Sequence, residues 1–336
     1  MRSRRLSPFL FSVVLFALPL FAETPPRNWG RCPAVVSLQT TEVVHALGDT
    51  HGDYDRLVTL LVAGKLIAGA PAAPQQVSWT GGKSILVVTG DMIDKWKQSL
   101  DVIALMRALM ASAASQGGRV VISTGNHEAE FLENPTSSKT KEFQKELKAA
   151  GIDPKEVAEG TDAEGIGKFL LCLPFASRVN GWFFAHAGST KGRTLEQLGR
   201  DLQKEVDEEG YGAKVLLGNK GLLEARMKPP WWEKPGDQPI ESMARLLGNA
   251  DALGVKHIVF GHQPGSYTFN DGSKRKKGTM FDFNGLAILI DMGMSRGVDD
   301  SGVGYSEGAL LRIQGEGAPE TATAIFADGS QEQLWP

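Results

Sequence analysis

The sequence predicts an α/β fold, and two features carry this expectation. Five apolar runs each stop abruptly in a small cluster of Asp, His, Asn and Gly residues, as buried strands do where they reach the edge of an active site. Helical patterns separate the first three runs, which gives the order strand, helix, strand, helix, strand. This alternation is typical of an α/β core. Five such strand ends in one chain also suggest a metal centre with more than one ion.

The elements can be justified in order along the chain. Residues 54–66 and 99–114 carry apolar side chains at helical spacing and are predicted to be helices. Residues 131–168 and 191–256 are polar and helical, and we expect both to be insertions outside the core. The second of these contains a charged helix predicted over Leu195–Glu209.

The C-terminal part is predicted to be hairpin sheet rather than a continuation of the alternating pattern. Its strands are expected near Thr279–Phe283, Ala287–Asp291 and Leu310–Gln314. Residues 23–42 form a lead-in that is rich in proline at its start. One domain over residues 43–336, with two helical insertions, therefore fits better than two domains.

The first 22 residues differ from the rest of the chain. Three arginines precede an almost continuous apolar run from Pro8 to Phe21, and Ala22 offers a small residue for cleavage. This is the pattern of a secretory signal peptide over residues 1–22, and its apolar core is short for a membrane span. We expect a periplasmic or secreted protein with no stable membrane insertion after cleavage. Leu20 is unusual three residues before the cleavage point, so an uncleaved membrane anchor is the alternative.

The charge balance argues against a nucleic-acid partner. Removal of residues 1–22 takes away three arginines and no acid, so the net charge falls from −3 to −6. An acidic protein is poorly suited to binding phosphate backbones. The basic run at residues 274–277 follows the turn sequence at 270–273, and we expect its four charges to be solvated at a hairpin tip.

The chain has two cysteines, Cys32 and Cys172. Export would permit a disulfide between them. Cys172, however, lies in the apolar stretch 169–173, which favours a buried unpaired thiol. No second thiol lies beside either residue, so neither is expected to bind a metal.

The five strand ends supply a set of metal ligands. They read GDTHGD at 48–53, GDMID at 90–94, GNHE at 125–128, HAG at 186–188 and GHQP at 261–264. Carboxylates and neutral imidazoles suit Mn, Fe and Zn, and a carboxylate that bridges two ions makes a clamp for phosphoryl chemistry. Asp49 and His51 are expected to point the same way because side chains alternate along a strand. The candidate ligands are Asp49, His51, Asp91, Asn126, His186 and His262.

A lone histidine at the end of a strand is more often a hydrogen-bonded core residue than a ligand. Four of the six histidines nevertheless fall in these junctions, and together they favour a metal site. The other two, His45 and His257, lie before or within strands and are expected to be structural.

These motifs, in this order, resemble those of the calcineurin-like metallophosphoesterase superfamily. The forms GDxHG, GDxxD, GNHE and HAG are most similar to the phosphoprotein phosphatase (PPP) branch. The segment Asp291–Gly297, which reads DMGMSRG, resembles the Shewanella-like phosphatases within it. The match spans about residues 43–297. It implies a four-layer αββα sandwich with two mixed β-sheets and helical insertions.

The resemblance also implies roles for individual residues. Asp49, His51 and Asp91 would hold one divalent ion (Mn, Fe or Zn). A second ion would be held by Asp91 as the bridge, together with Asn126, His186 and His262. A metal-bound hydroxide would attack phosphorus directly, and no covalent phosphoenzyme is expected. His127 would protonate the leaving oxygen and Asp94 would orient it.

Two positions depart from the family pattern. Arg usually follows the Asp of the second motif, and here it is Lys95, which binds phosphate as a point charge rather than as a bidentate fork. The second phosphate-binding Arg is expected at Arg226, for which an exposed surface residue is the alternative. At the fifth motif Pro264 replaces the second His of phosphodiesterase members, which favours monoester hydrolysis by analogy.

The leading hypothesis is therefore an exported phosphatase with two metal ions that hydrolyses phosphomonoesters. Its substrate would be a phosphorylated protein, serine/threonine- or tyrosine-linked, or a small aryl or alkyl phosphate. Hydrolysis of phosphoanhydrides, such as dinucleoside polyphosphates, is the alternative, since the same metals could perform it. A non-catalytic phosphate-binding protein is a third hypothesis, and only the weakened Lys95 position favours it.

Overall fold

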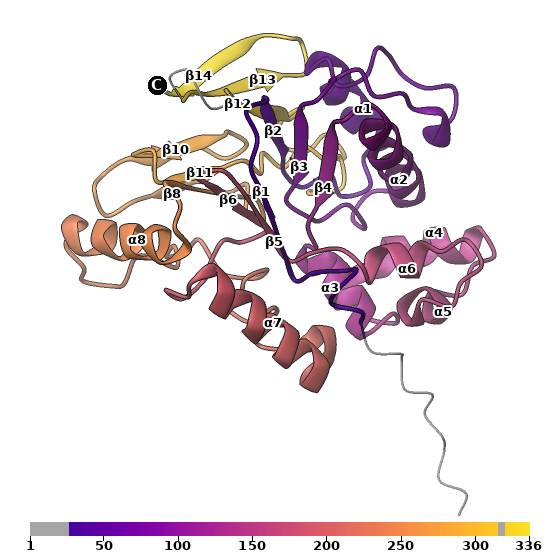
Figure 1. The fold of residues 1–336 in the computed structure, drawn as a ribbon, viewed down its shortest axis with the longest axis horizontal. Coiled ribbons are helices and arrows are strands. Elements are labelled where there is room, and N and C mark those ends of the chain that lie inside the picture. The colour runs from indigo at the N-terminus through magenta and orange to yellow at the C-terminus, as the bar shows by residue number, and fades with distance from the viewer. Residues whose placement is uncertain (1–26, 315–319) are drawn as a thin grey trace, which may run out of the picture.

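The computed structural model describes residues 27–314 and 320–336. The predicted signal peptide at residues 1–22 lies outside the described residues. In the described part of the chain, no helix is both long enough and apolar enough to span a membrane. Figure 1 shows two large β-sheets with helices around them, which confirms the predicted α/β class.

Sheet 1 carries the first three predicted motifs. Its strands β2, β3 and β4 are parallel, whereas β12, β13 and β14 extend it as antiparallel neighbours. In spatial order the strands are β14 (Gln331–Trp335), β13 (Ala322–Phe326), β12 (Ala309–Ile313), β2 (Val44–Leu47), β3 (Ile85–Val88) and β4 (Arg119–Ile122).

Sheet 2 carries the last two motifs. Its strands β6, β7 and β11 are parallel, and β10 and β5 flank them as antiparallel neighbours. In spatial order the strands are β1 (Val35–Leu38), β5 (Ala176–Val179), β6 (Trp182–Ala185), β7 (His257–Phe260), β11 (Ala287–Leu289) and β10 (Phe281–Phe283). A separate hairpin joins β8 (Tyr267–Thr268) to β9 (Lys274–Arg275).

The helices cover the outer faces and fill the two predicted insertions. They are α1 (Tyr54–Ala63), α2 (Ser99–Ser115), α3 (Asn126–Glu133), α4 (Lys141–Ala149), α5 (Pro154–Glu159), α6 (Ile166–Leu170), α7 (Leu195–Glu209) and α8 (Pro239–Leu253). Three short 3-10 turns accompany them: η1 (Pro74–Gln76), η2 (Ser138–Thr140) and η3 (Gly210–Gly212). Helix α7 has the predicted bounds, whereas α1 stops at Ala63 because Lys65 turns into the left-handed region (φ 58°).

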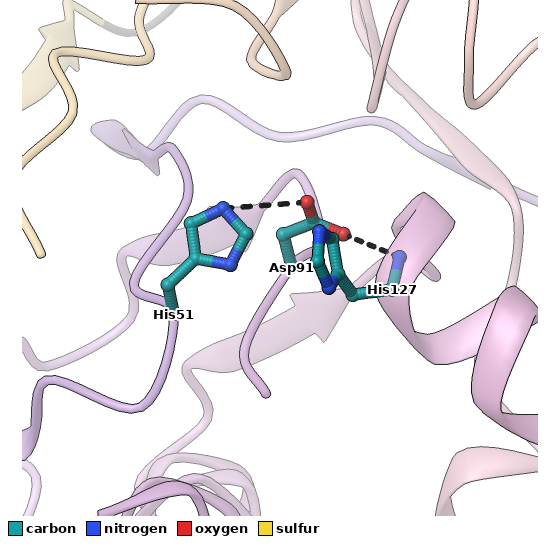
Figure 2. Close-up of side chains that lie close together, drawn as sticks. All are labelled: His51, Asp91 and His127. Carbon is teal, nitrogen blue, oxygen red and sulfur yellow. Dashed lines mark hydrogen bonds and ion pairs between the residues drawn. The ribbon is translucent and has the colours of Figure 1, made fainter. Parts of the chain in front are cut away.

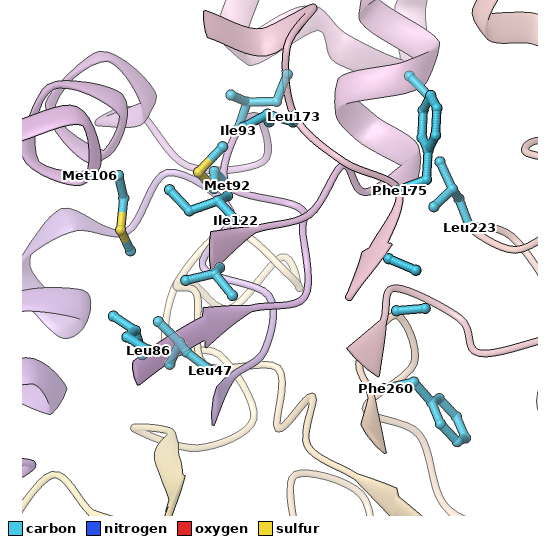
Figure 3. Close-up of a cluster of buried hydrophobic side chains, with 14 of the residues drawn as sticks. Leu47, Leu86, Met92, Ile93, Met106, Ile122, Leu173, Phe175, Leu223 and Phe260 are labelled. Atoms are coloured by element: carbon cyan, nitrogen blue, oxygen red, sulfur yellow. The ribbon is translucent and has the colours of Figure 1, made fainter. Parts of the chain in front are cut away.

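Alternation along the strands divides the core into layers. In β3, Ile85 and Val87 belong to a cluster that contains strand residues of both sheets and no residue of a described helix. Their neighbours Leu86 and Val88 belong to the larger cluster, which includes Met106 of α2; Figure 3 shows part of it. The sheets therefore pack against each other through one face of each and against helices through the other.

The lead-in is fastened to the domain. Strand β1 pairs in parallel with β5. Cys32 forms a disulfide with Cys172, so the expectation of a buried unpaired thiol was wrong. The apolar stretch 169–173 ends in a turn after α6. Arg27, in the lead-in, donates a hydrogen bond to the Leu173 carbonyl at the end of this stretch (2.7 Å).

The disulfide generates a stability prediction. Replacement of both cysteines by serine should destabilise the protein by about 2–4 kcal/mol, because the bridge closes a long loop in the unfolded chain. Thermal unfolding with and without a reductant is the measurement. The wild type should lose stability when reduced, whereas the double variant should not respond. Equal melting temperatures for the oxidised wild type and the double variant would contradict the prediction.

Candidate functional site

The polar strand ends meet between the two sheets. Backbone amides tie the loops within each sheet: His51 N donates to the Asp91 carbonyl (2.8 Å) and Gly261 N to the His186 carbonyl (2.8 Å). His186 Nδ1 also lies 3.2 Å from the Thr89 carbonyl, which joins sheet 2 to sheet 1. The carboxyl ends of parallel strands from both sheets therefore border one site.

Asp91 lies at the centre of this site. Its side chain is 2% exposed, and Oδ2 lies 3.5 Å from His51 Nε2 and 3.3 Å from His186 Nε2. Oδ1 accepts a hydrogen bond from the backbone N–H of His127 (2.9 Å). Figure 2 shows Asp91 between His51 and His127, with dashed lines to both. One carboxylate thus contacts groups from the first, third and fourth motifs.

Two groups of potential ligands share Asp91. The first contains Asp91, His51 and His127, and the second contains Asp91, His186 and His262. Asn126 Oδ1 lies 3.0 Å from His186 Nε2 and so faces the second group. His262 Nδ1 lies 3.2 Å from the same nitrogen. The structure therefore brings the predicted bridge together with candidate ligands from both groups.

Asp49 and His51 both face the site, but for a different structural reason from the predicted one. Strand β2 ends at Leu47, and His51 has a left-handed backbone (φ 43°), so regular strand alternation does not explain why both side chains face inward. The Asp49 oxygens accept from His262 N (3.1 Å each) and lie 3.9 Å from His51 Nε2 and His186 Nδ1. A tight loop, rather than the strand pleat, aims both residues.

Glycines in the motifs allow the carboxylates to approach the backbone. A Cβ atom on Gly125 would lie 2.1 Å from Asp91 Oδ1, and one on Gly261 would lie 2.2 Å from Asp49 Oδ1. Neither position can hold a larger residue without displacing a ligand.

The electrostatics of the site fit bound cations. Burial lowers the pKa of His186, but the carboxylates of Asp91 and Asp49 outweigh burial and raise it to about 10. Burial and the neighbouring Asp291 hold the pKa of Asp49 well above its usual range. These shifts show an excess of buried negative charge, which divalent ions would compensate. The donors are only oxygen and imidazole nitrogen, so the set fits Mn, Fe or Zn.

His127 and Asp94 are close enough to act as a pair. His127 Nδ1 lies 3.2 Å from Asp94 Oδ2, and burial of His127 is outweighed by Asp91 and Asp94, so its pKa is raised. The amides of Glu142 (2.8 Å) and Phe143 (3.2 Å) hold Asp94 Oδ1. His127 is also close enough to Asp91 for both to bind one ion. The Asp94 carboxylate, however, faces Nδ1 of His127, so Nε2 is the nitrogen that remains to donate a proton.

Lys95 and Arg226 lie at the rim. Both side chains are exposed. Burial lowers the pKa of His51 to about 3, and the charge of Lys95 adds to that shift. At His127, whose pKa is raised, Lys95 opposes the rise. Burial and the neighbouring His186 lower the pKa of His262, and Arg226 adds to that shift. Arg226 also pairs with Glu224 at 3.7 Å. Lys95 directly follows Asp94, the partner of His127, whereas Arg226 precedes Met227, whose N–H bonds Gln263 beside His262. The two cations therefore lie next to different groups of candidate ligands.

Glu128 was not identified from the sequence, although it belongs to the third motif. Its carboxylate is 0% exposed and accepts four backbone hydrogen bonds. These come from Asp91 N (2.9 Å), Met92 N (2.7 Å), Ile93 N (3.1 Å) and Gly125 N (2.7 Å). Glu128 therefore clamps the second motif to the third, and the extra acid in GNHE was the signal that could have revealed it.

The segment 291–297 provides a sixth strand end, after β11. Ser295 Oγ donates to the His51 carbonyl (3.0 Å). Arg296 bonds the buried carboxylate of Asp53 through N (2.9 Å), Nε (2.9 Å) and Nη2 (2.6 Å). The segment therefore braces the first motif from sheet 2, a role that the sequence had not indicated.

The remaining histidines, His45 and His257, and the buried Trp232 are not among the candidate ligand groups. His257 stacks on Trp182, with ring centroids 3.8 Å apart, and His45 is buried in β2. Trp232 is buried against Phe260 and Phe269, so core packing accounts for it.

Comparison with known proteins gives the family. The model of the calcineurin-like phosphoesterase family matches residues 43–266, which is most of the chain. The protein therefore belongs to this family, and the motif resemblance is confirmed. Within the family it is similar to Shewanella-like protein phosphatase 2 of Arabidopsis thaliana, 28% identical over 76% of this chain and 72% of that protein. An uncharacterised protein of Schizosaccharomyces pombe is 25% identical over 91% and 87%, respectively.

Two further similarities concern a solved structure and a bacterial hydrolase. The cold-active protein-tyrosine phosphatase of a psychrophilic Shewanella species has a similar structure, with a TM-score of 0.67 and 22% identity over 89% of this chain and 82% of that one. At this identity the likeness shows the fold alone. A symmetrical bis(5'-nucleosyl)-tetraphosphatase of Escherichia coli is 26% identical over 50% of this chain and 51% of its own length.

The Glu128 clamp can be tested by substitution. Glu128→Gln replaces one accepting oxygen with an NH₂ group that faces amide donors, so we expect a loss of about 2–4 kcal/mol in the free energy of unfolding. Chemical denaturation is the measurement. Glu133→Gln on the same helix is the matched control, because Glu133 accepts only one backbone bond, from Gly212 N. Equal effects of the two substitutions would refute the clamp.

Proposed function

We propose that this protein is a phosphatase with two divalent ions that hydrolyses phosphomonoesters. The observation that carries the proposal is the buried Asp91 carboxylate, which is shared by two groups of candidate ligands. A carboxylate between two cations is the arrangement that serves phosphoryl transfer to water. Membership of the calcineurin-like phosphoesterase family supports the reaction class.

The proposed ligand set divides into two halves. Asp49, His51 and Asp91 would hold one ion, and Asp91, Asn126, His186 and His262 the other. Bound ions would supply Lewis acidity and a water nucleophile that is active at neutral pH. The protein groups would orient the phosphate and limit access of bulk water, since five of the six side chains are buried and His262 is partly buried.

Residues at the rim would bind the phosphate oxygens. Arg226 and Lys95 lie next to different groups of candidate ligands, so a phosphate at the centre can be contacted from both sides. Arg226 offers a planar fork, whereas Lys95 offers a single point charge. This asymmetry would place more of the orienting contact on the side of Arg226.

His127 would donate the proton that the leaving oxygen needs. Asp94 Oδ2, 3.2 Å from Nδ1, would stabilise the protonated ring and leave Nε2 to face the substrate. General acid catalysis of this kind is worth about 10²–10⁴-fold in rate. Its value depends on the leaving group, because a good leaving group needs little protonation.

A second candidate is hydrolysis of phosphoanhydrides. The similarity to the tetraphosphatase of Escherichia coli favours it, although that similarity covers half of each chain. A substrate panel that includes a dinucleoside tetraphosphate, phosphotyrosine and phosphoserine peptides and aryl phosphates would separate the two activities.

We further propose that the protein acts outside the cytoplasm. The signal-peptide pattern of residues 1–22 supports this, as does the disulfide between Cys32 and Cys172, since disulfides persist in oxidising compartments. Fractionation of cells that express the full chain would test it.

Metal removal tests the reaction class. The purified protein should hydrolyse p-nitrophenyl phosphate, lose activity after chelation and dialysis, and recover it when Mn²⁺ is added. Asp91→Asn should lose both metal and activity because the bridge loses its charge. Asp251→Asn on the exposed side of α8 is the control and should behave as wild type. Turnover that survives complete chelation would refute the proposal.

The acid role of His127 predicts a dependence on the leaving group. His127→Asn should retain its metals and lose about 10²–10⁴-fold in kcat on an alkyl phosphate. The loss on p-nitrophenyl phosphate should be much smaller. Steady-state kinetics on both substrates, with metal analysis of the same samples, provide the measurement. Equal losses on the two substrates would show that His127 does not act as a general acid.

A further inference from the structure

The basic run at residues 274–277 is not uniformly solvated. Lys274, Lys276 and Lys277 are exposed, as expected for a hairpin tip. Arg275, in contrast, is 3% exposed and lies inside the protein. The expectation that all four charges are solvated was therefore wrong for this residue, and a buried guanidinium needs a structural reason.

We propose that Arg275 is a positioning residue for the half of the metal centre that contains His262. The proposal rests on the two-ion function proposed above and adds a residue that the family motifs do not contain. Arg275 lies on β9, whereas the loop that it holds follows β7, so the hairpin and the ligand loop are distinct segments.

The contacts of Arg275 connect three segments. Nε (3.1 Å) and Nη2 (3.0 Å) donate to the Thr279 carbonyl, within the connection that leads to β10. Nη1 donates to the Gln263 carbonyl and Nη2 to the Asp291 carbonyl. Gln263 directly follows His262, and Asp291 begins the sixth strand end. One guanidinium thus holds the loops after β7 and β11 together.

Gln263 extends this connection to the phosphate-binding side. Its side-chain Oε1 accepts from Met227 N (2.8 Å), and Met227 directly follows Arg226. The hairpin makes a second contact nearby, since Gly278 N donates to the Pro264 carbonyl (2.9 Å). A displacement of Gln263 would therefore move both His262 and the backbone next to Arg226.

Nearby carboxylates stabilise the positive charge of the buried Arg275. Burial lowers its pKa to about 10, and the carboxylates of Asp291 and Asp49 oppose that shift, so the group stays charged at neutral pH. Lysine cannot replace it, because a planar guanidinium directs donors to separate carbonyls whereas an ammonium is a single point. Residues that orient metal ligands in this way typically change metal affinity by about 10–100-fold when they are replaced.

The test compares neighbours within one basic run. Arg275→Lys should raise the dissociation constant of one of two Mn²⁺ ions by about 10–100-fold and leave the other nearly unchanged. Lys274→Met and Lys276→Met are matched controls and should keep both affinities. Competition with a chelator of known affinity, followed by metal analysis, gives the two constants.

The outcomes separate this proposal from the function on which it rests. If the wild type binds two ions and Arg275→Lys binds both equally well, with only a lower melting temperature, Arg275 merely supports the fold. If the wild type binds fewer than two ions, the two-ion function itself fails.

A measurement on the wild type keeps the proposal testable if Arg275→Lys does not fold. Hydrogen exchange of the metal-free protein should slow on addition of Mn²⁺ at residues 260–265 and, through Arg275, at residues 274–279. Protection confined to residues 260–265 would overturn the coupling.

Discussion

The buried pair of carboxylates, Asp49 and Asp91, is the constraint on which the rest of the structure depends. Removing such groups from water is costly unless positive charge compensates them. In this protein the compensation falls on two of the neighbouring imidazoles, because the carboxylates raise the pKa of His186 to about 10 and also raise that of His127. Divalent ions would relieve the same excess charge. Burial of the two carboxylates therefore costs free energy in folding, and the same excess of negative charge favours the binding of metal ions.

Much of the framework serves to hold these groups in strained positions. Five residues other than glycine have left-handed backbones within the motifs or directly after one: His51, Asp91, Asp94, Lys95 and His262. Each costs of order 1–3 kcal/mol and persists only where its surroundings fix it. Glu128 fixes the second motif, Ser295 and Arg296 fix the first, and Arg275 fixes the fifth. All of these residues hold motif backbone in place, although they come from distant parts of the chain.

The sequence predicted the parts of this arrangement that follow from local pattern. Strand ends, the candidate ligands that meet at the site and the bounds of α7 were accessible because apolar periodicity and polar tips are local signals. The inward turn of His51, the burial of Arg275 and the pairing of Cys32 with Cys172 were not. Each depends on segments that meet only in three dimensions, and the residue types alone favoured the opposite expectation in two of these cases, Arg275 and Cys172.

Anomalous scattering from crystals of the Mn²⁺-loaded protein tests the central claim most directly. If Asp91 bridges two ions, the anomalous difference map should show two peaks, one on each side of its carboxylate, with Asp49 and His51 at one peak and His186 and His262 at the other. A single peak, or two peaks of which one has no contact with Asp91, would contradict the account.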